Sequence, residues 1–175
     1  NSAPVDAIAT GDLDEDGKMD FVSVVAGEIR VFLSDTGLKN LTNFSNGYQS
    51  VHVADVVPGT PLGLEIVVIG DLGVDVFIVD PIRADGLKNG PPELSWADGS
   101  SLSVDGGIAD FDHDGALEMI VGDRQVGGGP LRLLNLDAPI TVGWSSIEVT
   151  SAREVAVDDI NGDGWADFAI ATGPN

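Results

Sequence analysis

Three short segments of the chain carry oxygen-bearing side chains at one spacing. Each has Asp at position one, Asp or Asn at position three, Asp at position five, Gly at position six and an acid at position nine. These acidic loops are residues 12–20, 110–118 and 159–167. Because Gly permits a sharp turn, the side chains at positions one, three, five and nine can converge on one point. Hard oxygen ligands in that number suit Ca²⁺, which accepts about six to eight oxygens, better than Mg²⁺.

Each predicted site combines four side chains with the backbone carbonyl at position seven. The first set is Asp12, Asp14, Asp16 and Asp20 with the carbonyl of Lys18; the second is Asp110, Asp112, Asp114 and Glu118 with that of Ala116; the third is Asp159, Asn161, Asp163 and Asp167 with that of Trp165. We therefore expect about three Ca²⁺ ions. The third set carries one charge fewer and should bind more weakly.

Two other interpretations of the loops are weaker. An EF-hand needs an acid at position twelve and flanking helices, but position twelve is Ser23, Val121 or Ile170 and the flanking segments are rich in β-branched residues. Acidic turns that merely cap hairpins in solvent would not need the same spacing three times. A fourth, degenerate copy begins at Asp55 and lacks the central acids, so we expect it to hold no metal.

The loops belong to a longer repeat. The steps between Asp12, Asp55, Asp110 and Asp159 are 43, 55 and 49 residues. Short apolar, β-branched runs flank each loop, and Gly, Asp and Pro bound them, which is typical of strands. We expect an all-β fold in which each unit is a four-stranded antiparallel sheet and the loop joins its first two strands. The predicted units are 1–49, 50–104, 105–153 and 154–175.

Repeated four-stranded units of this length favour a β-propeller, with each unit as one blade. A β-sandwich also has many short strands, but it gives no reason for the same loop chemistry in every unit. The chain holds about three and a half blades, whereas closed propellers typically have about four to eight. We therefore expect residues 1–175 to be one partial propeller domain, completed by the rest of a longer chain or by neighbouring chains.

The three acidic loops, each followed by an apolar strand, resemble the FG-GAP/VCBS repeats of integrin-like β-propellers. The stretch from Gly127 to Leu133 also resembles one found in bacterial extracellular members. The resemblance covers essentially the whole chain. It implies a calcium-stabilised propeller that is secreted or on a cell surface and serves in adhesion, in ligand binding or beside enzymatic domains. The chain departs from the family in lacking its Phe-Gly and Gly-Ala-Pro cage and in the degenerate second loop.

Composition excludes several classes of function. The chain has 29 Asp and Glu against 8 Lys and Arg, a formal net charge of −21. Phosphate would repel such a surface, which argues against nucleic acid and against docking on anionic membranes. No apolar run reaches the roughly 18 residues that a membrane-spanning helix needs. Cysteine is absent, so disulfides, Cys-based zinc sites and thiol nucleophiles are excluded.

The sequence predicts no catalytic residue. His52 falls in a strand-like run, His113 occupies a non-ligand position of the second loop, and no nucleophile elbow, P-loop or dinucleotide-binding fingerprint occurs. We therefore expect a non-enzymatic, calcium-stabilised extracellular module for adhesion, surface assembly or ligand binding, with a protein or glycan as partner. The alternatives are the propeller part of a polysaccharide-acting enzyme, and a lectin in which Trp96 or Trp144 stacks on sugar.

Overall fold

The computed structural model describes residues 4–35, 37–41, 47–57, 59, 63–79, 92–97, 103–123, 129–146 and 152–173. Pro58 of the degenerate loop and the 127–128 part of the glycine-rich stretch lie outside these residues. The described segments form strands, turns and loops without a helix. No helix in them is therefore long and apolar enough to cross a membrane.

The strands form four antiparallel sheets in chain order. Sheet 1 contains β1 (Val5–Gly11), β2 (Asp20–Val25), β3 (Glu28–Leu33) and β4 (Gly37–Leu41). Sheet 2 contains β5 (Tyr48–Ala54), β6 (Glu65–Gly70), β7 (Gly73–Ile78) and β8 (Leu94–Ala97). Sheet 3 contains β9 (Ser103–Ala109), β10 (Glu118–Asp123), β11 (Arg132–Asn135) and β12 (Thr141–Ser145), and sheet 4 contains β13 (Ala152–Asp158) and β14 (Asp167–Thr172).

The predicted all-β fold with four-stranded antiparallel sheets is confirmed. Each acidic loop joins the first two strands of its sheet, as the repeat predicted. The first strands of sheets 2, 3 and 4 begin at Tyr48, Ser103 and Ala152, two residues before the predicted unit starts. In sheets 2 and 4 the extra residues pair beyond an irregularity in the register, which alternation alone does not reveal.

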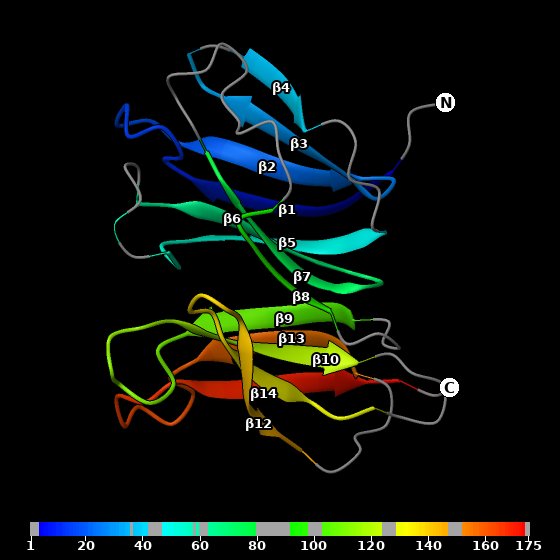
Figure 1. Cartoon of the computed structure of the whole chain (residues 1–175), viewed down its shortest axis with the longest axis vertical. Coiled ribbons are helices and arrows are strands. Elements are labelled where there is room, and N and C mark those ends of the chain that lie inside the picture. The colour runs from blue at the N-terminus through cyan, green and yellow to red at the C-terminus, as the bar shows by residue number, and fades with distance from the viewer. Residues whose placement is uncertain are drawn as a thin grey trace.

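The sheets stack along the long axis of the molecule (Figure 1). The first strands follow one another in this direction, with β1 against β5, β5 against β9 and β9 against β13. These contacts place sheet 1 first and sheet 4 last in the series, and in Figure 1 sheets 3 and 4 overlap in the half of the molecule opposite sheet 1. The described part of the chain therefore forms an open series of sheets rather than a closed ring of blades. A complete propeller therefore stays a prediction.

The hydrophobic core lies between successive sheets in three clusters. Between sheets 1 and 2, Val22 and Val24 pack with Ile66 and Val68. The second cluster joins sheets 2 and 3, and the third joins sheets 3 and 4. Strands β6 and β10 are buried along their whole length because other sheets cover both of their faces. This double burial explains why their sequences are apolar runs rather than alternating patterns.

Candidate metal sites

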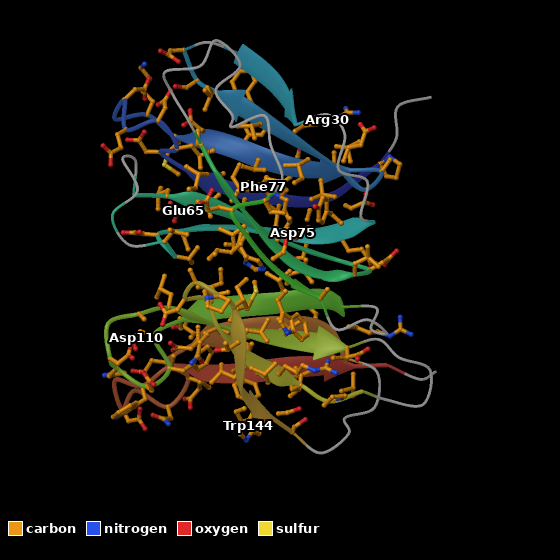
Figure 2. The ribbon with its side chains drawn as sticks, viewed as in Figure 1. Arg30, Glu65, Asp75, Phe77, Asp110 and Trp144 are labelled. Carbon is orange, nitrogen blue, oxygen red and sulfur yellow. The ribbon has the colours of Figure 1, made fainter. Side chains whose placement is uncertain are left out.

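All three acidic loops emerge on the same side of the stack (Figure 1). The described residues of the degenerate loop, between β5 and β6, lie on this side too. Figure 2 shows Asp110 at this side, on the loop that leads from β9 to β10. This common placement follows from the repeat, because every unit begins with a strand that runs in the same direction toward its loop.

The acidic loops share one network of hydrogen bonds. In each loop the carboxylate at position one accepts a hydrogen bond from the backbone N–H of the glycine at position six. The N···O distances are 2.9 Å for Gly17 and Asp12, 3.1 Å for Gly115 and Asp110, and 2.8 Å for Gly164 and Asp159. Side chains at positions three and five also accept from the N–H two residues later. Asp and Asn are short enough for these local bonds, which explains why positions one, three and five carry Asp or Asn rather than Glu.

Two positions of each loop adopt left-handed backbone conformations. The glycines at position six have φ values of 82° at Gly17, 91° at Gly115 and 89° at Gly164. Position four is also left-handed, with φ of 56° at Glu15 and 60° at His113. The third loop has Gly162 at this position. Sequence reasoning found the glycine at position six and missed position four, where Glu15 and His113 hold a conformation that non-glycine residues rarely adopt.

The structure brings together three of the four predicted side-chain ligands in each of the first two loops. Carboxylate oxygens of Asp12, Asp14 and Asp20 lie within 4.8 Å of one another, and those of Asp110, Asp112 and Glu118 do the same. Both groups could hold a metal ion. The position-five acids Asp16 and Asp114 are not members of these two groups.

A buried oxygen without a partner marks each of these two groups. Oδ1 of Asp12 and Oδ1 of Asp110 are buried and accept no hydrogen bond, whereas Oδ2 of each accepts one from the loop glycine. A buried carboxylate oxygen with no partner is costly. A cation bound among these carboxylates would supply the missing interaction, so the residues fit a hard divalent ion.

The acid at position nine has a role that the motif did not reveal. Asp20 is 1% exposed, and its two oxygens accept from the backbone N–H of Leu13 at 2.9 Å and of Ser34 at 2.8 Å. Glu118 accepts from the N–H of Phe111 at 2.8 Å in the same way. These bonds fix the start of each loop against the strand that follows it.

The degenerate loop keeps this bond although it has lost the central acids. Glu65 is fully buried, and its Oε2 accepts from the N–H groups of Val56 at 2.9 Å and Val57 at 3.1 Å. Figure 2 shows Glu65 beside the strands rather than out on the loop. Asp55 is exposed, and no group of metal-ligating side chains includes it among the described residues.

Local charges disfavour ionisation in the interior of the loops. Burial, together with the carboxylate of Asp20, raises the pKa of Asp14 above its usual value of 3.8. Burial, aided by the other carboxylates of the second loop, raises the pKa of Glu118 above 4.5. By contrast, Lys18 Nζ lies 2.6 Å from Asp16 Oδ2 and lowers the pKa of Asp16. A bound cation would favour the ionised forms of Asp14 and Glu118, because it would offset both the cost of burying their charge and the repulsion between neighbouring carboxylates.

A second acidic group in the first loop was not predicted. It consists of Asp14, Asp16 and Asp35, whose carboxylate oxygens also lie within 4.8 Å of one another. Asp35 follows β3 and lies fifteen positions beyond the loop, so the spacing of the motif could not reveal it.

The third loop is arranged differently from the other two. Its carboxylates at Asp159, Asp163 and Asp167 do not form a compact group within the described residues. Both oxygens of Asp159 accept backbone hydrogen bonds, and the Asn161 amide donates to Asp163 Oδ2 at 3.0 Å. A metal here would need these side chains to rearrange. The proposed carbonyl ligands at Lys18, Ala116 and Trp165 stay predictions in all three loops.

The histidines lie in two different settings. His52 Nε2 lies 3.3 Å from Ser50 Oγ, but Ser50 donates its hydrogen bond to Asp105 at 2.7 Å. Ser50 is 8% exposed and burial lowers the pKa of His52. Asp105 also accepts from the N–H of Val155 at 2.9 Å, so this polar cluster joins sheets 2, 3 and 4. In a catalytic triad the histidine lies between the serine and the aspartate, whereas here the serine lies between the other two.

The exposed histidine pairs with an aromatic residue of the next loop. His113 stacks on Trp165 with 4.0 Å between ring centroids and 26° between planes. Trp165 nevertheless keeps half of its surface exposed. Trp144 on β12 is also about half exposed and projects from the outside of sheet 3 (Figure 2). Trp96 is more covered and lies beneath the guanidinium of Arg132.

Comparison with known proteins leaves function to be inferred from the loops and sheets. No protein-family model matches the chain. No curated protein matches it either.

Proposed function

We propose that the chain is a non-enzymatic calcium-binding module in which the ions hold the three acidic loops, each of which links the first two strands of its unit. The orphaned Oδ1 atoms of Asp12 and Asp110 carry this proposal, because they occur at the same position of two loops with the same backbone. Calcium is the preferred ion because the sites offer only oxygen ligands and several of these are carboxylates.

The principal role proposed for the ions is structural. Binding to the folded chain alone would stabilise it by mass action. Each ion would also neutralise carboxylates in a chain of net charge −21. Asp20 and Glu118 would serve twice, as ligands through the oxygen that approaches the ion and as acceptors for the loop backbone.

The wider setting is part of the same proposal. The stacked four-stranded sheets with acidic loops on one side support a propeller of the FG-GAP/VCBS type, although no family model matches. Modest calcium affinity suits an extracellular location, where the ion is at millimolar concentration. We propose adhesion or surface assembly as the role, with a protein or glycan as partner.

Chelation tests the metal. We expect the chelator EDTA to lower the melting temperature by more than about 5 °C and millimolar Ca²⁺ to restore it. The double variant Asp12→Asn/Asp110→Asn should lose most of this response, whereas Asp55→Asn, on the degenerate loop, should keep it. A melting temperature that ignores both chelator and Ca²⁺ would contradict the proposal.

Glycan binding is a second candidate, favoured by the His113–Trp165 stack. The half-exposed Trp165 ring stacks on His113 and belongs to a loop whose Asp and Asn side chains could bind sugar hydroxyls. A glycan array probed with the wild-type chain and with Trp165→Ala would test it. Loss of signal in the variant alone would support this candidate, and absence of signal in both would remove it.

A further inference from the structure

The internal interfaces between sheets follow one register. On the first strand of each unit, the residues that stand two and four places before position one of the loop point toward the preceding sheet. Val53 of β5 meets Gly11 of β1, where an added Cβ would lie 2.7 Å from Val53 Cγ1. Val157 of β13 meets Gly107 of β9, where the corresponding distance is 2.2 Å. Residues three and five places earlier point toward the following sheet.

The same register leaves an apolar face at the sheet 1 end of the stack. Ile8 is the equivalent of Val51 and Val155, which are 5% and 7% exposed because a preceding sheet covers them. Ile8 itself is 61% exposed. Phe21, the equivalent of the fully buried Ile66, is also exposed and stacks on Phe32 across β2 and β3. We call Ile8, Thr10, Phe21, Arg30 and Phe32 the outer face of sheet 1.

The opposite end presents a face of small residues. Ala156 pairs with Ala169, and Glu154 pairs with Ala171, on the side of β13 and β14 that points away from sheet 3. These residues are exposed or partly exposed and line, with Ile170, a shallow depression of about 280 Å³. We call Glu154, Ala156, Ala169 and Ala171 the outer face of sheet 4.

The two outer faces complement each other as the internal faces do. At two of the three internal interfaces, a small residue on one sheet receives a larger side chain of the next, as Gly11 receives Val53 and Gly107 receives Val157. Between sheets 2 and 3 the later sheet supplies the small residue, because Gly106 receives Ile69. Large residues on the outer face of sheet 1 and alanines on the outer face of sheet 4 repeat the arrangement of the other two interfaces. Charge also matches, because Arg30 lies on one outer face and Glu154 on the other.

A polar contact within the stack supports the same pairing. Asp105, five places before its loop, accepts a hydrogen bond from the N–H of Val155 on the next sheet. Glu154 occupies the place of Asp105 in its unit, and Ile8 occupies the place of Val155. The carboxylate of Glu154 is therefore placed to accept a hydrogen bond from the backbone N–H of Ile8, if a sheet like sheet 1 follows sheet 4.

We propose that the outer face of sheet 1 binds the outer face of sheet 4 of a second copy of this chain. The occupant is a second copy because its end face continues the register of the internal interfaces, offers small residues opposite large ones, and places Glu154 on the face opposite Arg30. The contact joins two different faces, so copies associate head to tail and form either a ring or a filament.

Mass measurement across concentration tests this proposal, with Ca²⁺ present. We expect light scattering to show a mass that rises to at least about twice that of one chain at ~300 µM. Ile8→Asp on one face and Ala169→Asp on the other should each give monomers. Leu72→Asp matches the exposure of Ile8 but lies on the β6–β7 turn, so this variant should still associate.

Mixing the two monomeric variants identifies the geometry. Each retains one intact face, so an equimolar mixture should form dimers and nothing larger. Thr10→Asp and Ala156→Asp provide a second pair if either first variant loses its circular dichroism spectrum. A wild-type chain that stays monomeric, a mixture that stays monomeric, or association that survives in Ala169→Asp would each overturn the proposal. The calcium response of every variant should be unchanged, so this test is independent of the metal sites.

Discussion

The acid at position nine carries two interactions that the motif does not separate. Its spacing marks it as a metal ligand, whereas its burial and its bonds to backbone N–H groups make it an anchor for the loop. Glu65 separates the two roles, because it keeps the anchor in a loop without the central acids. The anchor therefore accounts for an acid at this position even where no metal is expected.

Glu65→Gln should lower the free energy of unfolding by about 2 kcal/mol, since the charged acceptor for two backbone N–H groups becomes neutral and a buried amide donor is added. Urea unfolding measures this change. Glu28→Gln, on an exposed β3 side chain, is the matched control and should have little effect. Equal stability of the two variants would show that the anchor contributes nothing.

The raised pKa values of Asp14 and Glu118 predict how pH acts on the metal sites. In the metal-free fold these carboxyls keep their protons to higher pH than in the unfolded chain, so their contribution to stability is lost as pH rises through the range above 3.8 and 4.5. Calcium needs the ionised forms. The calcium-induced rise in melting temperature should therefore be full near pH 7 and shrink as pH falls below about 5. A rise that is unchanged at about pH 4 would contradict this coupling.

Among the elements, the three acidic loops differ in ways that their shared backbone conceals. The first two bring carboxylates into compact groups. In the third, both oxygens of Asp159 accept hydrogen bonds from backbone N–H groups. Asn161 adds an internal amide bond to Asp163. The third site is expected to bind Ca²⁺ more weakly because it carries less charge. The internal hydrogen bonds are a second reason for weaker binding, because they compete with the ion for the same oxygens.

Luminescence of bound Tb³⁺ should follow the filling of the loops, with Trp165 as sensitiser, because this residue belongs to the third loop and stacks on His113 of the second. We expect the third loop to fill last in a titration, at least about tenfold more weakly than the others. Asp159→Asn should remove this last phase and leave the earlier ones. Simultaneous filling of all sites, or loss of an early phase in Asp159→Asn, would contradict the ranking.

Across the whole molecule, close approach of neighbouring sheets depends on missing side chains. Gly107 leaves room for Val157, and Gly106 leaves room for Ile69. These glycines are needed because the first strands of successive sheets pack tightly at the axis of the stack. The glycine content therefore serves packing as well as turns.

Gly107→Ala should destabilise the fold by about 1–3 kcal/mol, because the new Cβ would overlap Val157 Cγ2. Val157→Ala removes that methyl group. The double variant should consequently be more stable than the sum of the two single losses by about 1 kcal/mol. Urea unfolding of the four chains gives this coupling, and strict additivity would mean that the two residues do not meet as described.

The sequence by itself determined the local features of the fold. Loop positions one to six, the strands on either side and the repeat that relates them follow from short-range rules, since Asp, Gly and β-branched residues act within a few residues of their own position. The four-stranded antiparallel sheets could be predicted for this reason, as could the carboxylates that come together within each of the first two acidic loops.

Only the tertiary structure decided what lies across longer distances. The buried position-nine anchors, the grouping of Asp35 with the first loop, the Ser50–Asp105–Val155 bridge and the two outer faces each join segments far apart in the sequence. Their geometry depends on how the sheets stack and twist, which no local pattern encodes. Stacking also decided which apolar residues are core and which, like Ile8, are left on a face, because Val51 and Val155 at equivalent places in the repeat are buried by a preceding sheet.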